Sequence, residues 1–256
     1  MKRLLISILI ILPSIATAFN KKGHPHRLHH SLAYAHPGDN FRRGANQSYI
    51  LGQATDGWGL NFALSWRLPR NLYVFTGYDL TFFNLDAGAM STQVNNRYSQ
   101  DGYYINTEMH IGGTLFHNLH TGISWLYKMR WLEVEPFANA GIVFAGLDEE
   151  KRFVTGRKEM NSNYTDTISV KYDDSRVPSA FSFNAGLMLH KNIIPRLNIC
   201  AGVRYVSYSS MNFYFSESSY DYLGNQGQSS SFMLRQGFDY WQVNFGVQLL
   251  IGKPKS

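Results

Sequence analysis

Apolar and polar residues alternate from Thr107 to Trp131, and this period of two constrains the fold more than any other feature of the sequence. The odd positions are mostly large and apolar: Met109, Ile111, Leu115, Leu119, Ile123, Trp125, Tyr127 and Met129. The even positions are mostly small, polar or charged: Glu108, His110, Gly112, Thr114, Asn118, His120, Gly122, Ser124, Lys128 and Arg130. Because successive side chains of a strand point to opposite faces, the pattern predicts one strand of about 22 residues, longer than the roughly 9–11 that cross a bilayer. An apolar face this rich in Trp, Tyr, Leu and Ile suits lipid, so we expect a transmembrane β-barrel.

The N-terminus has the pattern of a secretory signal peptide over residues 1–18. Met1-Lys2-Arg3 precedes an apolar run from Leu4 to Ile15, and Ala16-Thr17-Ala18 forms a small-x-small cleavage site. No later apolar run approaches the ~18 residues that a membrane helix needs. Of the residues, 44% are hydrophobic and 15% aromatic, so the exported chain is expected to be an outer-membrane barrel or, alternatively, a soluble periplasmic β-barrel. Because Cys200 is the only cysteine, no intramolecular disulfide is expected.

Residues 19–45 do not alternate and are rich in histidine and basic residues. Such tracts can bind Zn, Ni or Cu, and the weak candidates for metal ligands are His24, His26, His29 and His30. Because these histidines do not follow a fixed metal-ligand spacing, we expect the segment to be a flexible basic leader in the periplasm. We expect no bound metal or other cofactor.

Six further segments alternate with period two, at 58–66, 72–82, 134–144, 181–189, 197–205 and 241–251. Three long polar loops, at 86–102, 148–176 and 216–231, separate some of them. Bacterial barrels have an even number of strands, short periplasmic turns and long extracellular loops. We therefore expect an eighth strand at 46–53 and a barrel over 46–256. Splitting the long strand at His117 would also give eight strands, with the loop at 86–102 moved to the periplasm, and ten strands is a further alternative.

The predicted inward faces carry charges of both signs. They are Arg67, Asp79, Glu108, His110, Lys128, Arg130, Glu133, Glu135 and Arg204. An eight-stranded barrel is just wide enough for side chains to fill it, and charges buried there must pair. The sequence therefore predicts a salt-bridged, largely plugged interior.

These patterns favour a structural or surface-interaction role in the outer membrane of a Gram-negative bacterium, without catalysis. One alternative is a narrow channel or transporter for small or hydrophobic solutes, which would need an open lumen or a lateral gap. Another is a lipid-modifying hydrolase or acyltransferase, which needs a serine, a histidine and a carboxylate close together at the outer rim. His110 and Glu108 are expected at the outer end of their strand, and Ser210, on the same predicted inward face as Arg204, could meet His110. The expected partners are outer-membrane lipid and lipopolysaccharide, the barrel-assembly machinery, and an extracellular or periplasmic protein. An exported protein is not expected to bind nucleic acid.

The chain resembles the small outer-membrane β-barrel proteins of the OmpA/OmpX and PorT-like kind, especially those of Bacteroidetes. The resemblance covers about 46–256 and rests on the signal peptide, the repeated x-Gly-x strands, Glu135-Pro136-Phe137-Ala138-Asn139-Ala140-Gly141, and the closing segment from Trp241 to Ile251. It implies a membrane barrel but carries over no functional residue. Barrels of this kind often end on an aromatic residue, whereas this chain adds Lys253-Pro254-Lys255-Ser256 after its last strand.

Overall fold

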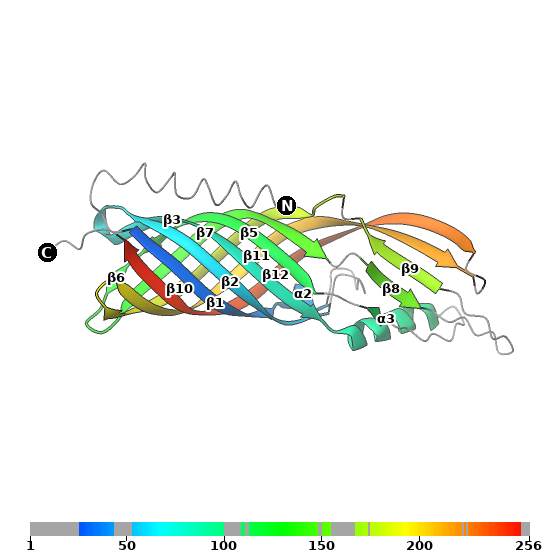
Figure 1. Cartoon of the computed structure of the whole chain (residues 1–256), viewed down its shortest axis with the longest axis horizontal. Coiled ribbons are helices and arrows are strands. Elements are labelled where there is room, and N and C mark those ends of the chain that lie inside the picture. Colours follow the sequence, from blue (N-terminus) through cyan, green and yellow to red (C-terminus); the bar gives the residue numbers. More distant parts are fainter. Residues whose placement is uncertain are drawn as a thin grey trace.

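The computed structural model contains a closed ring of eight antiparallel strands (Figure 1). The described residues are 26–43, 53–99, 109–110, 113–147, 150–154, 167–173, 175–221, 223 and 225–251. The ring consists, in order, of β1 (His26–Pro37), β2 (Ala54–Arg67), β3 (Leu72–Leu85), β5 (Thr114–Trp125), β7 (Glu133–Leu147), β10 (Ser179–Ile194), β11 (Leu197–Tyr220) and β12 (Gln226–Ile251). β12 pairs with β1 and closes the ring, so the barrel wall has no free edge. The predicted eight-stranded up-and-down barrel is confirmed.

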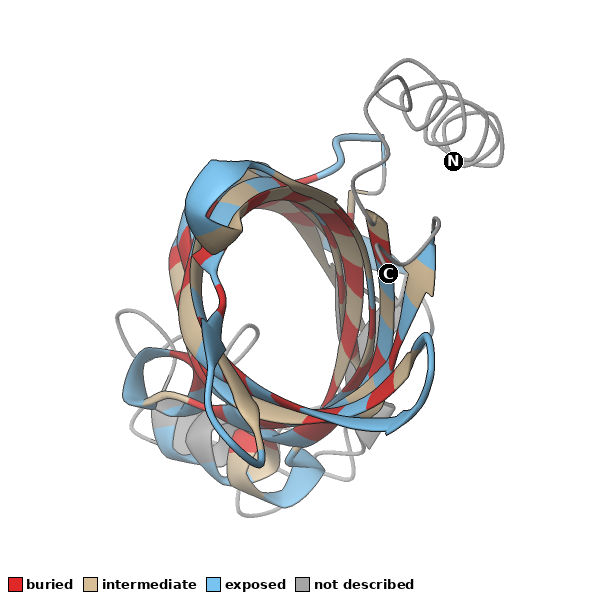
Figure 2. Ribbon diagram, turned by 90° about the vertical axis from the view of Figure 1, so that its left-hand side faces the viewer, coloured by how far each residue is buried: buried red, intermediate tan, exposed pale blue. Residues whose placement is uncertain are grey.

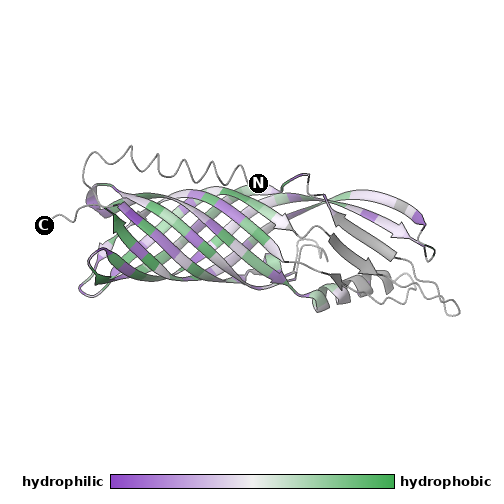
Figure 3. Cartoon of the chain, viewed as in Figure 1, coloured by the Kyte–Doolittle hydropathy of each residue, from purple (hydrophilic) through white to green (hydrophobic). Residues whose placement is uncertain are grey.

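Side chains alternate between the lumen and the exterior along every barrel strand, which Figure 2 shows as bands of buried and exposed residues. Hydrophobic and hydrophilic residues alternate over the length of the barrel (Figure 3), and many large hydrophobic side chains are exposed. They include Leu32, Phe62, Ile123, Ile142, Phe183, Ile199, Trp241 and Phe245. An apolar surface of this extent on a closed barrel, whose strand backbone groups pair with one another, is what a lipid bilayer requires. The protein is a transmembrane β-barrel of the outer-membrane type.

The two ends of the barrel differ in the length of their connections. At one end lie the short connections, which contain η3 (Pro69–Asn71), β6 (Tyr127–Lys128) and the turn at 195–196. The other end carries α2 (Asp39–Arg43), α3 (Ala87–Ser99), β4 (Met109–His110), β8 (Glu150–Val154) and β9 (Thr167–Tyr172). Short turns on the periplasmic side and long loops outside are the rule for bacterial barrels. Among the helices that the structure describes, none is long and apolar enough to cross a membrane.

The first strand lies in a segment predicted to be a flexible leader. Residues 26–37 form β1, which pairs over its length with β12 and from His26 to Ala35 with β2. The prediction of a leader over 19–45 is therefore wrong for these residues. Leu28, Leu32 and Tyr34 face outward, while Ser31, Ala33 and Ala35 face inward, but the histidines between them hide this alternation in the sequence. The strand predicted at 46–53 lies outside the described residues except for Gln53.

The long strand predicted from Thr107 to Trp131 is divided into three. β5 has the predicted inward and outward faces, but it ends at Trp125, where the buried Leu126 donates its N–H to the Asn71 carbonyl oxygen at 3.0 Å. β6 then pairs with β7, and β4 pairs with β8 outside the barrel. The alternation of inward- and outward-facing side chains seen in β5 ends at Leu126, and residues 127–131 are all exposed.

The segment 216–231, predicted to be a loop, belongs to two long strands. β11 runs to Tyr220 and β12 begins at Gln226, so the connection between them is only 221–225. β11 also pairs with β9, which pairs with β8. The parts of β4, β8, β9, β11 and β12 beyond the barrel form what we call the outer sheet. A bulge between Tyr208 and Met211 reverses the parity of β11, so Ser210 is exposed rather than inward.

Candidate functional site in the barrel lumen

Two ion pairs cross the lumen between strands that lie opposite each other in the ring. Asp79 of β3 pairs with Arg204 of β11, four strands away in either direction, with Oδ2 3.0 Å from Nη1. Glu135 of β7 pairs with Arg27 of β1, again four strands away, with Oε2 3.3 Å from Nη1. Each carboxylate also contacts a histidine from a neighbouring strand. These two pairs tie opposite walls of the barrel together.

Arg204 is the centre of the first network. Its Nε donates to Gln242 Oε1 at 2.6 Å, and its Nη2 donates to Asn61 Oδ1 at 2.5 Å. The Asn61 amide in turn donates to Asn244 Oδ1 at 2.8 Å. Asp79 also lies 3.1 Å from Nε2 of His120. Because a guanidinium offers five donors in one plane, one arginine can join β2, β3, β11 and β12 at this level.

Glu135 is the centre of the second network. Its Oε2 lies 2.7 Å from Nε2 of His190, and its Oε1 accepts a hydrogen bond from Ser124 Oγ at 2.5 Å. Arg27 stacks over the ring of Tyr73, with Cζ 4.1 Å from the centroid, and lies 3.8 Å from Glu133. Glu135 and Arg27 are 7% and 4% exposed, so removal of either charge would leave the other buried without its partner.

A cavity of about 70 Å³ lies between the two networks. Its polar lining includes His29, Asn61, Asp79, His120, Glu135, His190, Arg204, Asn244 and Gln248. Ring atom Nδ1 of both His120 and His190 is buried without a hydrogen-bond partner in the protein. A polar space of this size accommodates a few water molecules, which would satisfy such groups.

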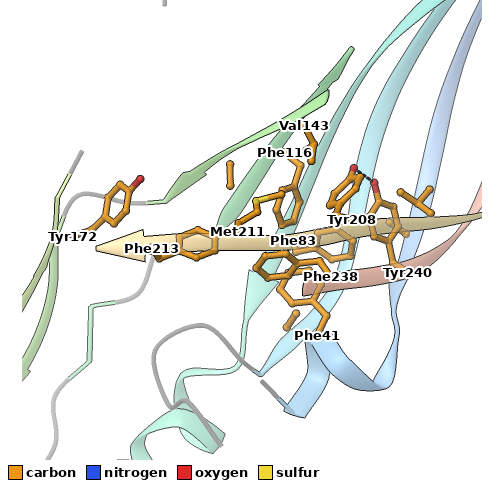
Figure 4. Packing of buried hydrophobic residues seen from close by; sticks show 14 of the residues in the cluster. Phe41, Phe83, Phe116, Val143, Tyr172, Tyr208, Met211, Phe213, Phe238 and Tyr240 are labelled. Carbon is orange, nitrogen blue, oxygen red and sulfur yellow. Dashed lines mark hydrogen bonds between the residues drawn. The ribbon is translucent and has the colours of Figure 1, made fainter. Parts of the chain in front are cut away.

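An aromatic plug fills the lumen above the networks, at the end with the long loops (Figure 4). Phe41 of α2 packs edge-on against Phe83 and Phe238, with ring centroids 4.9 and 4.8 Å away. Phe116 lies 5.0 Å from Phe238 and 5.2 Å from Tyr208 between ring centroids. The hydroxyls of Tyr208 and Tyr240 lie 2.5 Å apart, as the dashed line in Figure 4 shows. The lumen thus contains an apolar layer at the end with the long loops and a layer of ion pairs beneath it.

The structure places the predicted lumen charges in different settings. Asp79, Glu135 and Arg204 form the buried networks, and Glu133 lies at their edge. The other described members lie at the barrel end with short turns: Arg67 donates to Asn71 Oδ1 at 2.7 Å, and Lys128 and Arg130 are exposed. For Lys128 and Arg130 the prediction is wrong, because Leu126 is the last residue of this segment whose side chain faces inward and residues 127–131 are exposed. Glu108 and the side chain of His110 lie outside the described part of the chain.

Three residues that form ion pairs in the networks are absent from the predicted set: Arg27, His120 and His190. Arg27 lies in the segment predicted to be a leader. His120 and His190 had the inward parity in the sequence, but nothing local to either histidine indicates that a carboxylate lies beside it. Their pairing depends on which strands become neighbours in the closed ring.

The described histidines of the segment predicted to be a leader do not gather into one metal site. His26 and His30 have the outward parity of β1 and His29 has the inward parity, with His30 stacked on Phe62 at 4.5 Å between ring centroids. His24 lies outside the described residues. Within the described ranges, no group of three or more His, Cys, Asp or Glu side chains could hold a metal ion.

A histidine–carboxylate pair occurs on the exterior near the outer rim. Nδ1 of His36 lies 2.6 Å from Oδ1 of Asp56, and Tyr34 donates its hydroxyl hydrogen to the other oxygen of Asp56. Both members of the pair are about half exposed. Among the described residues, no serine hydroxyl bonds to His36, and Ser210 does not point into the lumen. The Ser–His–carboxylate arrangement considered from the sequence is therefore not assembled from the described side chains.

Gly77 leaves room for the His120 ring beside Asp79. A Cβ atom at this position would lie 2.5 Å from Cε1 of His120 and 2.8 Å from the Phe62 carbonyl oxygen. We expect Gly77→Ala to displace His120 and to lower the free energy of unfolding by about 1–3 kcal/mol, measured by urea titration in lipid vesicles. Gly146→Ala is the matched control, because its Cβ would lie 3.8 Å from the nearest atom. Equal stability of the two variants would show that the His120 ring is not closely packed.

The strand ring, the apolar exterior and the filled lumen define the chain as a small outer-membrane β-barrel protein. No protein-family model and no curated protein sequence matches it. The solved structures similar to it include Neisserial surface protein A (NspA), with 10% identity over 88% of this chain and 97% of that chain and a TM-score of 0.43. OprG from Pseudomonas aeruginosa has 8% identity, coverage of 91% and 98%, and a TM-score of 0.45. A major outer membrane protein from Thermus thermophilus has 13% identity, coverage of 89% and 100%, and a TM-score of 0.44.

The class of the chain rests on its own strand pairing and apolar exterior, and the finer assignment to the OmpA/OmpX or PorT-like kind stays a prediction.

Proposed function

We propose that the protein is a closed outer-membrane barrel that presents its outer sheet to a partner at the cell surface, and that it has no catalytic activity. The observation that carries the proposal is the doubly closed lumen. Two ion pairs join opposite walls, and the plug around Phe41 and Phe116 covers them on the outer side. Free passage of solutes would require both layers to rearrange.

The outer sheet is fixed to the barrel by its own apolar side chains. Phe213 and Leu234 are paired across β11 and β12, as are Phe215 and Phe232, and all four belong to or pack against the plug. On the opposite face, Ser229, Ser231, Met233 and Arg235 are exposed. A sheet held in this way has a defined orientation, which favours specific contact with another molecule.

The proposal is tested by photo-crosslinking in intact cells. A photoreactive phenylalanine analogue replaces Met233, and the control carries the same group at Ile199, which faces lipid. We expect a discrete protein adduct from position 233 that is absent from position 199. Adducts of the same mass from both positions, or none from any exposed position of the outer sheet, would contradict a partner at this face.

A second candidate is a narrow channel for small polar solutes, favoured by the polar cavity between the two networks. In that case water in the cavity would be part of a path that opens when the plug moves. The outer-membrane location also implies contact with membrane lipid and lipopolysaccharide, and with the barrel-assembly machinery during insertion. No step of either proposed function requires a cofactor.

A further inference from the structure

Basic residues are concentrated at the barrel end that has the short turns. The charged side chains described there, apart from the buried Arg27–Glu135 network, are Arg67, Arg70, Lys128, Arg130, Glu133, Lys191 and Arg196. All but Arg67 and Glu133 are exposed. The single acid, Glu133, is already paired with Lys128, with Nζ 3.4 Å from Oε1. We call this set of basic residues the basic rim.

The described charged side chains at the opposite end of the barrel are predominantly acidic. Its charged residues with described side chains are Asp39, Arg42, Asp56, Asp86, Asp173, Arg176, Glu217, Asp221, Arg235 and Asp239. Acids outnumber bases there, seven to three. The charged side chains that the structure describes are therefore distributed asymmetrically along the barrel axis.

Large apolar side chains lie beside the cations of the basic rim. Trp131 is 76% exposed and Met129 63%, and the guanidinium of Arg130 lies 5.5 Å from the Trp131 ring centroid. On the next short turn, Ile193 and Ile194 are 52% and 55% exposed between the basic residues Lys191 and Arg196. Exposed tryptophan and isoleucine next to arginine and lysine suit the boundary between hydrocarbon and headgroups, where the cations reach outward to phosphate.

From this combination we propose that the basic rim binds the headgroups of anionic phospholipids in the periplasmic leaflet. The rim continues the lipid-facing belt of the barrel, because Lys191 has the outward parity of Phe183 and Leu189 on β10. Negatively charged headgroups complement the cations, and the exposed apolar side chains insert beside the acyl chains. The contact would also fix the depth of the barrel in the bilayer.

Spin-labelled lipids test this proposal on the folded protein in phosphatidylcholine vesicles. We expect the wild-type barrel to immobilise phosphatidylglycerol with a relative association constant about threefold or more above that of phosphatidylcholine. The double variant Arg130→Gln/Lys191→Gln should bring the ratio close to one. At about 1 M salt, where the screening length is roughly 3 Å, the wild-type preference should also disappear.

The matched control is Arg42→Gln/Arg235→Gln, which removes the same charge from the other end and should keep the wild-type ratio. A wild-type ratio of one overturns the proposal, as does an equal fall in both double variants, which would reflect net charge alone. Wild-type protein that shows no lipid preference but sediments with purified peptidoglycan would assign the rim to an acidic cell-wall polymer instead.

Discussion

Replacement of Arg204 by methionine is expected to lower the free energy of unfolding by about 3–5 kcal/mol, because it leaves a buried carboxylate without its partner. The variant leaves the Asp79 carboxylate buried at 2% exposure, without the guanidinium that lies 3.0 Å away in the native barrel. It also removes the hydrogen bonds to Asn61 and Gln242. The measurement is a urea titration in lipid vesicles, with the folded fraction read from heat-modifiable gel mobility.

The double variant Asp79→Leu/Arg204→Met separates the contribution of the ion pair to stability from the contribution of side-chain packing. With both charges removed, no buried ion is left alone, so the double variant should lose much less stability than the sum of the two single variants. Arg176→Met is the control for loss of an arginine, since this side chain is 63% exposed and 4.0 Å from Asp173, and little change is expected. Additive single effects would mean that the two side chains do not form an energetic pair.

Phe116→Ala is expected to cost about 3–5 kcal/mol of unfolding free energy, because it leaves a cavity in the aromatic plug. Phe116 is fully buried and lies within 6.2 Å, between ring centroids, of Phe41, Phe83, Tyr208 and Phe238. The same urea titration checks the loss. Benzene should recover part of it, since a cavity lined by apolar side chains binds small apolar molecules.

The control for this prediction is Leu223→Ala, at the tip of the β11–β12 connection, where the side chain is 68% exposed and little change is expected. A Phe116 variant as stable as this control, with no response to benzene, would show that the plug collapses or was never closely packed.

The alternation in the sequence was sufficient to predict most of the barrel wall. The faces of β2, β3, β7 and β10 follow the predicted parity, because lipid outside and a narrow lumen inside require opposite chemistry on successive residues. It failed for β1, where His26 and His30 occupy lipid-facing positions and disguise the pattern. It also failed beyond Tyr208, where a bulge reverses the parity of β11 without any local sequence signal.

The lumen was less predictable than the wall. Parity placed Asp79, Glu135 and Arg204 inside, but it could not show that Arg204 reaches Asp79 rather than Glu135, which depends on strand order and register in the closed ring. The aromatic plug was missed for a related reason. Phe83, Phe116 and Phe238 have inward parity but are far apart in the sequence, and Phe41 comes from α2, a short helix outside any strand pattern.

Single-channel recording in planar lipid bilayers distinguishes a closed barrel from one that conducts. We predict that the folded wild-type protein inserts without stable conductance steps, under conditions in which a 16-stranded porin conducts, because the ion-pair layer and the aromatic plug both obstruct the lumen. Stable, voltage-independent conductance of the wild-type barrel would contradict a closed barrel. It would show that the two layers open in the membrane, and solute passage would replace surface presentation as the proposed function.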